Sequence, residues 1–205
     1  MGLENPWNSV PLEVYEGHME HCSQLQTLNR VMREQMNSFP AAESVAIAGV
    51  AGGNGLEHCG GRFKTVYGID INPEYLRVCA GRFQTVLGDR LRLMEMDLVH
   101  REFPAVALII ADLFIEYVGV EVFCSKAAAA EAKYVSCIIQ GADSGQSFVS
   151  ASPYQSELEG IGRLHGDVDE AELAECMDRY GYGVSYREVI ELPDGKRLIR
   201  VDYCR

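Results

Sequence analysis

Basic residues are scarce in this chain of 205 residues. It has 18 Lys and Arg against 30 Asp and Glu, which gives a formal net charge of −12. A protein that follows a phosphate backbone needs a stripe or cluster of basic side chains, and the sequence shows none. The charge balance therefore argues against a nucleic acid as partner.

Long hydrophobic runs are missing as well. No stretch approaches the roughly 18 consecutive apolar residues of a membrane helix, so we expect no membrane partner. The first residues, MGLENPWNSVPLEVYEG, have neither a basic start nor an apolar core, and they do not predict a signal peptide. The seven cysteines are scattered and form no C-x-x-C pair, unlike a disulfide framework or a zinc site. We therefore expect a cytoplasmic protein with reduced thiols.

The N-terminal region has apolar residues at helical spacing. Between residues 12 and 37 they recur every three or four positions, which predicts an amphipathic helix or a helix pair that ends before Pro40. Residues 1–10 are predicted to be a loose lead-in. We interpret residues 1–40 as a helical lid over a core formed by residues 41–205, the two together making one domain of residues 1–205.

Beyond the lid, short apolar runs alternate with helical segments. The runs with strand character are SVAIAGV, TVYGIDI, LRLMEMDL, ALIIADLFI and KYVSCIIQG. They are apolar throughout, as strands buried on both faces of a parallel sheet are. A long polar loop at 141–165 and a helix at 167–180 follow. Two β-rich runs joined through a turn at 193–196 then predict a terminal antiparallel hairpin.

A glycine-rich turn occupies the centre of residues 45–59. It follows the first predicted strand and holds Gly49, Gly52, Gly53 and Gly55. Glycines allow a positive φ and let a ligand approach the backbone closely. Asn54 is predicted to cap a helix that starts with GLEHC, with Glu57 reaching back as in a capping box. The free N–H groups of such a helix end suit an anionic group.

A carboxylate follows at the end of the second predicted strand. Asp70 stands 21 residues beyond Gly49, where it can accept hydrogen bonds from both hydroxyls of a ribose. A nucleoside beyond the first two strands is therefore expected. The dinucleotide fingerprint G-x-G-x-x-G is not met, because Ala51 and Asn54 stand at its third and sixth positions. A dinucleotide-dependent oxidoreductase remains an alternative, but a less favoured one.

Together these motifs make the sequence similar to the class I S-adenosylmethionine-dependent methyltransferases, over about residues 44–141. The first turn of that family reads acid-x-Gly-x-Gly-x-Gly. Gly49 and Gly53 match its first and third glycines, Ala51 replaces the second, and Ile47 replaces the acid. The resemblance implies an α/β fold: a Rossmann-like, mostly parallel seven-stranded sheet with helices on both faces, an antiparallel C-terminal hairpin and an extra N-terminal helix.

The resemblance also implies a cofactor, S-adenosylmethionine, and residues that bind it. Asp70 would bind the ribose, Asp97 would lie beside the adenine amino group, and ADLF at 111–114 would face the methyl group. The cofactor-binding set expected from the turn, the acids, their neighbours and the lid is Gly49, Ala51, Gly52, Gly53, Asn54, Gly55, Asp70, Ile71, Asp97, Leu98, Asp112 and Tyr15. No metal is expected: His18, His21 and Cys22 share a helix face, but no third ligand accompanies them.

Catalytic residues are expected after the fourth strand. Methyl transfer is an in-line displacement, in which a protein mainly positions and desolvates the nucleophile. Asp112, Glu116 and Tyr117 are the candidates, with Glu116 as base if the acceptor must lose a proton. Its alternative interpretation is a carboxylate that complements a helix N-terminus. His165 is a further candidate base.

We therefore predict an S-adenosylmethionine-dependent methyltransferase that acts on a small molecule or a protein side chain. A non-catalytic binder of S-adenosylmethionine or S-adenosylhomocysteine is the main alternative, which the departures at Ile47 and Ala51 permit. The acceptor is expected beside the loop at 141–165, between Phe148 and Tyr154.

Overall fold

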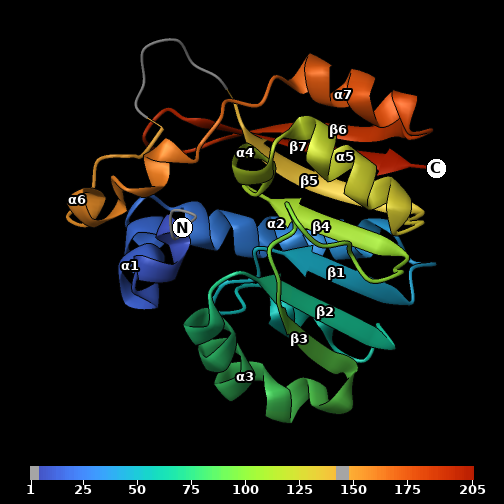
Figure 1. Ribbon diagram of the computed structural model, residues 1–205, viewed down its shortest axis with the longest axis horizontal. Helices are drawn as coiled ribbons and strands as arrows, with labels where there is room; N and C mark the ends of the chain where they lie inside the picture. The colour runs from blue at the N-terminus through green and yellow to red at the C-terminus, as the bar shows by residue number, and fades with distance from the viewer. Residues whose placement is uncertain (1–4, 142–147) are drawn as a thin grey trace.

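The predicted strands assemble into one sheet in the computed structural model, which describes residues 5–141 and 148–205 (Figure 1). Its strands are β1 (Ser44–Ala48), β2 (Thr65–Asp70), β3 (Leu91–Glu95), β4 (Leu108–Asp112), β5 (Tyr134–Gln140), β6 (Gly183–Glu191) and β7 (Arg197–Cys204). Their order is β3-β2-β1-β4-β5-β7-β6. The first five strands are parallel, and β7 is antiparallel to both β5 and β6.

The strand order reverses between β1 and β4. The chain builds β1, β2 and β3 outward in one direction and then returns to place β4 on the other side of β1. Loops from neighbouring strands therefore diverge at the carboxyl ends of β1 and β4, and open sheets bind ligands in the crevice at such a point.

Helices cover both faces of the sheet because the central strands are apolar on both faces. On β1, Val45 and Ile47 pack in the core beneath α2 (Gln24–Ser38) and α3 (Pro73–Leu87). Ala46 and Ala48 face the other layer, which is formed by α5 (Val120–Ala129) and α7 (Glu170–Arg179). The shorter helices are α1 (Leu12–His21), α4 (Ile115–Val118) and α6 (Gln155–Leu158).

The N-terminal helical region is a pair. The two helices are separated at Ser23, whose φ of 60° lies in the left-handed region. Pro11 precedes the first helix and occupies its N-cap position. The first helix lies at the crevice end of the sheet, beside α6 (Figure 1). The second helix buries Met32 and Met36 against the sheet, so most of its apolar face belongs to the core. On this face of the sheet, α2 takes the place of the helix that the sequence predicted after the glycine turn.

That helix after the glycine turn is one prediction that was wrong. Leu56–Cys59 forms a single 3-10 turn capped by Gly55, whose φ is 92°. Asn54 does not cap it, because its Nδ2 donates to the carbonyl of Leu25 at 2.9 Å. Tertiary contact with α2 thus replaces the local capping pattern. Glu57 does accept a backbone hydrogen bond, from Gly55 N at 3.1 Å.

The long polar segment after β5 has structure of its own where it is described. It includes α6 and a 3-10 turn at Ile161–Arg163, and residues 142–147 lie outside the described residues. Leu158 and Ile161 pack against Val10 and Val14 of the N-terminal region. Within the described residues, none of the helices combines the length and apolar character that crossing a membrane requires.

Candidate functional site

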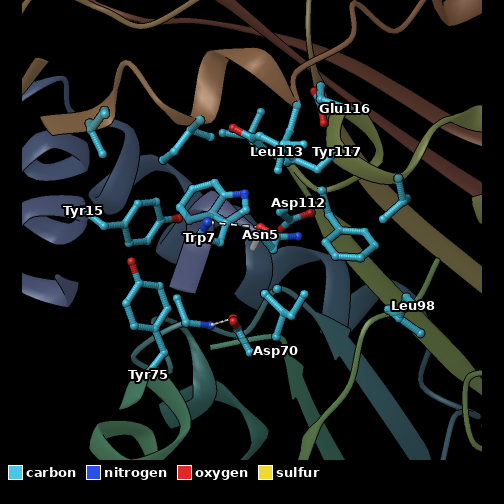
Figure 2. Close-up of a pocket in the computed structure, with 18 of the residues that line it drawn as sticks. Asn5, Trp7, Tyr15, Asp70, Tyr75, Leu98, Asp112, Leu113, Glu116 and Tyr117 are labelled. Carbon is cyan, nitrogen blue, oxygen red and sulfur yellow. Dashed lines mark hydrogen bonds between the residues drawn. The ribbon is translucent and has the colours of Figure 1, made fainter. Parts of the chain in front are cut away.

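A cavity opens beyond the carboxyl ends of β1, β2 and β4 (Figure 2). The space between its walls that no atom fills measures about 1240 Å³, part of it open solvent. Ten of the predicted cofactor-binding and catalytic residues line it: Tyr15, Gly49, Ala51, Asp70, Ile71, Asp97, Leu98, Asp112, Glu116 and Tyr117. Residues that are far apart in the sequence thus meet at the point where the strand order reverses.

The later part of the glycine turn, residues 52–55, does not line the main cavity. Gly52 and Asn54 line a smaller adjoining cavity, which shares Asp112 with the main one. Gly53 and Gly55 line neither. A Cβ on Gly53 would come within 2.7 Å of the Phe83 ring, and one on Gly55 would collide with Met32. These two glycines therefore permit close packing of α3 and α2 around the turn.

The first part of the turn has unusual backbone geometry. Gly49 has a φ of 69°, and Ala51, which carries a Cβ, has a φ of 46°. Leu113, directly after β4, has a φ of 52°. Non-glycine residues rarely adopt this region, and such strain clusters at functional sites. Both strained residues line the cavity.

Asp70 holds this turn in place. Its Oδ2 accepts a hydrogen bond from Ala51 N at 2.8 Å, and its Oδ1 accepts one from Asn72 N at 2.9 Å (Figure 2). The side chain is almost fully buried, with 9% of the residue exposed. Burial raises the pKa of Asp70, and the backbone hydrogen bonds oppose that shift. The carboxylate is therefore oriented before any ligand arrives.

An apolar slot adjoins Asp70. Ile71, Met96, Leu98 and Val99 supply its walls, and Asp97 stands among them. Met96 N donates to the carbonyl of Asp70 at 2.8 Å, which fixes the two strand ends together. Asp97 Oδ1 accepts a hydrogen bond from Val99 N at 2.9 Å, while Leu98 is buried. The slot therefore combines apolar side chains with the carboxyl group of Asp97.

Asp112 ends β4 at the junction of the two cavities. Its Oδ1 accepts a hydrogen bond from Gln35 Nε2 of α2 at 2.7 Å. Its Oδ2 is buried and has no hydrogen-bond partner among the described residues. Burial raises the pKa of Asp112 to about 7. A buried polar atom without a partner demands an explanation, and a ligand is one.

Glu116 is the second buried carboxylate of this kind. Its Oε1 accepts a hydrogen bond from Gln140 N at the end of β5, at 2.9 Å, and its own backbone N–H, in the first turn of α4, also favours the charged form. Its Oε2 is buried and lacks a partner in the described part of the chain. Burial raises the pKa of Glu116 to about 7. In Figure 2, Asp70 and Glu116 lie at opposite sides of the view, with Asp112 between them.

Aromatic rings form much of the remaining wall. The Trp7 ring makes edge contacts with Tyr15 and Tyr117, at centroid distances of 5.6 and 5.1 Å. Tyr15 stacks on Tyr75 at 6.1 Å (Figure 2). Burial raises the pKa of the Tyr117 hydroxyl well above its ordinary value. Phe148 meets Tyr117 at 6.2 Å.

Trp7, Tyr75 and Gln35 are site residues that sequence reasoning missed. The predicted loose lead-in instead forms a 3-10 turn at Pro6–Ser9, and the Asn5 side chain accepts a hydrogen bond from Trp7 N at 3.0 Å. The one available signal was Trp7 itself, the only tryptophan of the chain.

The other proposed side chains lie at the margin. His165 stacks on Phe148 at 3.5 Å and does not line the cavity; burial lowers its pKa. His18 lines the cavity, and its Nδ1 lies 2.7 Å from Ser152 Oγ. Tyr154 packs against Gly17 of α1. Within the described ranges, no three His, Cys, Asp or Glu side chains are grouped so that they could hold a metal ion.

Comparison with known proteins identifies the fold. No protein-family model and no curated protein sequence matches the chain. Among solved structures, magnesium protoporphyrin IX methyltransferase (ChlM) from Synechocystis with bound SAM is similar over 100% of this chain and 98% of its own, with a TM-score of 0.73 and 13% identity. The N-methyltransferase NodS from Bradyrhizobium japonicum is similar over 88% and 95%, with a TM-score of 0.63 and 13% identity. The predicted fold, that of the class I methyltransferases, is confirmed.

Proposed function

We propose that this protein is an S-adenosylmethionine-dependent methyltransferase acting on a small molecule or a protein side chain. The observation that carries the proposal is Asp70, a buried carboxylate held at the end of β2 by two backbone N–H groups, beside an apolar slot. A nucleoside needs such a carboxylate for its ribose and such a slot for its base. The ChlM structures of the same fold were solved with bound SAM or SAH.

The residues present fit this cofactor from end to end. Asp70 would accept hydrogen bonds from the ribose hydroxyls, and Ile71 and Leu98 would enclose the adenine, with Asp97 at its edge. Gly49 leaves room beside the turn, since a Cβ there would lie 3.2 Å from the Phe114 ring. The unpartnered Oδ2 of Asp112 is available to the amino group of the methionine moiety.

Asp112 also compensates for the acid missing from the first turn. Ile47, at the position of that acid, is buried in the core beneath α2 and does not reach the main cavity. Asp112 lines both cavities and is held by Gln35 of that same helix. A carboxylate supplied by the neighbouring strand therefore stands beside the glycine turn.

The cofactor would supply an activated methyl group, and the chain would supply position and exclusion of water. Trp7, Tyr15 and Tyr117 form an aromatic wall along the crevice. Asp112, Glu116 and Tyr117 are the residues we assign to the acceptor side. Glu116 can hold a proton near neutral pH, because burial raises its pKa to about 7.

The setting of the reaction follows from charge and thiols. The net charge of −12 disfavours a nucleic acid as acceptor. All seven cysteines are free thiols in the structure, and six of them are buried. We include a reducing, cytoplasmic location in the proposal on this basis.

Mass spectrometry of the ligand released from native protein tests the proposal, together with calorimetric titration of S-adenosylhomocysteine and NADH. We expect S-adenosylmethionine or S-adenosylhomocysteine to be released, and S-adenosylhomocysteine to bind while NADH does not. Binding of NADH alone would overturn the proposal in favour of an oxidoreductase. If S-adenosylhomocysteine binds but a metabolite and protein screen shows no cofactor-dependent gain in mass, the protein is a non-catalytic binder.

A further inference from the structure

The part of the cavity around Glu116 holds a buried carboxyl group, and no described Lys or Arg lines the cavity beside it. Glu116 is 4% exposed, and among the other described residues only Gln140 N donates a hydrogen bond to its two oxygens. A carboxylate removed from water is costly unless its charge is paired and its oxygens are hydrogen-bonded. The backbone fixes Glu116 there, because Gly166 N donates to its carbonyl oxygen at 2.8 Å. The Oε2 atom of Glu116 therefore lacks a hydrogen-bond donor among the residues that the structure describes.

No cation from the described residues answers this charge. Four carboxylates line the cavity, namely Asp70, Asp97, Asp112 and Glu116, while no described Lys or Arg lines it. Lys196 does not line the cavity, and its Nζ donates a hydrogen bond to the carbonyl oxygen of Phe148. An anionic ligand group would meet only like charges here.

The walls around Glu116 are aromatic and aliphatic. The rings of Tyr117 and Phe148 make an edge contact with centroids 6.2 Å apart, and Trp7 makes another edge contact with Tyr117. Leu158 and Ile161 complete the apolar boundary. Aromatic faces attract cations as well as apolar groups, most strongly where water is excluded. The surroundings thus combine one carboxylate with surfaces suited to an organic cation.

We propose that the methyl acceptor is an amine carried on an apolar or aromatic scaffold, which enters as an ammonium ion and pairs with Glu116. The inference rests on the proposed methyltransferase function and specifies its substrate class. An ammonium group supplies both the missing positive charge and the missing donor. A neutral hydroxyl would supply only a donor and leave the buried charge unpaired.

The chemistry balances with Glu116 as the base. One N–H proton of the ammonium moves to Glu116 Oε2, which leaves a lone pair on the nitrogen. The nitrogen then forms a bond to the methyl carbon as the carbon–sulfur bond breaks, and the electron pair of that bond stays on sulfur. The products are the N-methylated ammonium and S-adenosylhomocysteine, and the proton on Glu116 returns to solvent. Burial raises the pKa of Glu116 to about 7, which suits this transfer.

Isosteric probes test the inference on protein saturated with S-adenosylhomocysteine. We would compare arylalkylamines, benzylamine first, with the matching alcohols and carboxylates, using calorimetry and saturation-transfer NMR. We expect the amines to bind at least about tenfold more tightly than the alcohols, with the carboxylates weakest. Glu116→Gln should bring amines and alcohols to within about twofold of each other. Glu157→Gln, the same change at an exposed position of α6 outside the lining, should keep the preference.

The outcomes distinguish failure of the amine assignment from failure of the proposed methyltransferase function. Lack of an amine preference in the wild-type protein, undetectable amine binding included, overturns the amine assignment while binding of S-adenosylhomocysteine stands. A preference that survives Glu116→Gln also overturns it, because the charge would then be paired elsewhere. Failure of S-adenosylhomocysteine to bind at all overturns the proposed function itself.

Discussion

The two halves of the cavity treat the same kind of side chain in opposite ways. In the nucleoside half, around Asp70 and Leu98, the Asp70 carboxylate accepts a backbone hydrogen bond on each oxygen. In the acceptor half, around Asp112 and Glu116, each carboxylate has one donor and one oxygen without a partner in the described chain. All three acids follow or end a parallel strand of the same sheet.

This difference separates a preformed site from an incomplete one. Asp70 and the strained turn at Ala51 hold each other in place, so a nucleoside meets groups that are already oriented. Asp112 and Glu116 are buried with pKa values raised to about 7, and a ligand must complete their environment. We infer that the first half fixes the nucleoside of the common cofactor, whereas in the second half Asp112 meets its methionine end and Glu116 chooses the acceptor.

The largest expected effect comes from a substitution that impairs the acceptor half and leaves the nucleoside half intact. Glu116→Gln keeps an oxygen that can accept from Gln140 N, but it removes the charge and the base. We expect kcat to fall by about 10²-fold or more once an acceptor is known, because general-base catalysis contributes that much. The affinity for S-adenosylhomocysteine should stay nearly unchanged. Steady-state kinetics and calorimetry on the same preparation measure both quantities.

Wild-type turnover in this variant would show that Glu116 is not a base and has only a structural role, as the acceptor of the hydrogen bond from Gln140 N at the end of β5. A parallel loss of cofactor affinity would contradict the division of the cavity into two halves. Glu157→Gln is the matched control, since it changes the same charge at an exposed position.

The nucleoside half has its own prediction. Asp70→Ala removes the ribose acceptor and the anchor of Ala51 N, so it should weaken S-adenosylmethionine binding by roughly tenfold to a few hundredfold, at about 1.5–3 kcal/mol for a hydrogen bond to a charged group. Calorimetric titration measures the change. An unaltered affinity in a folded variant would remove Asp70 from the ribose site.

The strands and the nucleoside half were predictable because their signals are local. An apolar run such as YVSCIIQ of β5 predicts a buried strand wherever it stands, and Asp70 follows its strand directly. Gln35 was not predictable, because it reaches Asp112 across 77 residues of sequence and no spacing rule connects them.

Tertiary contacts also overrode local patterns. Asn54 and Glu57 have the spacing of a capping box, but α2 offers Asn54 the carbonyl of Leu25 and an amide donor from Asn29. The predicted helix therefore shrinks to one 3-10 turn. Trp7 was assigned to a loose lead-in because proline discourages a helix there. Its ring is nevertheless held by Tyr15 and Tyr117.

The free energy of unfolding of the ligand-free protein also distinguishes the two halves of the cavity. Burial raises the pKa of Asp112 from 3.8 to about 7, so burying its carboxylate destabilises the folded state; the penalty is complete above about pH 7 and fades as the pH falls towards 4. A shift of that size corresponds to about 4 kcal/mol at pH 8. We expect Asp112→Asn to recover about half of it, since a buried amide also lacks partners. The gain should shrink at pH 5.

Asp70→Asn should act in the opposite direction. Burial raises the pKa of Asp70 too, but an amide would turn an NH₂ group against one of the two backbone donors, Ala51 N or Asn72 N. We expect a loss of about 1–3 kcal/mol. Urea unfolding at pH 8 and pH 5 measures both variants. Changes of the same sign in the two variants would erase the distinction between the halves.

The smallest expected effect concerns Trp7, which touches both halves. Its ring contacts Tyr15 and Tyr117, and its carbonyl oxygen accepts a hydrogen bond from Asn72 Nδ2 at 2.8 Å, next to Asp70. Aromatic pairs contribute about 0.5–1.5 kcal/mol each. Trp7→Ala should therefore raise both the Kd for S-adenosylhomocysteine and the KM for the acceptor by about two- to tenfold. Because Trp7 is the only tryptophan, its fluorescence should also change as S-adenosylhomocysteine binds to the wild-type protein. An effect on only one of the two constants would assign Trp7 to that half, and silent fluorescence would place it away from the cofactor.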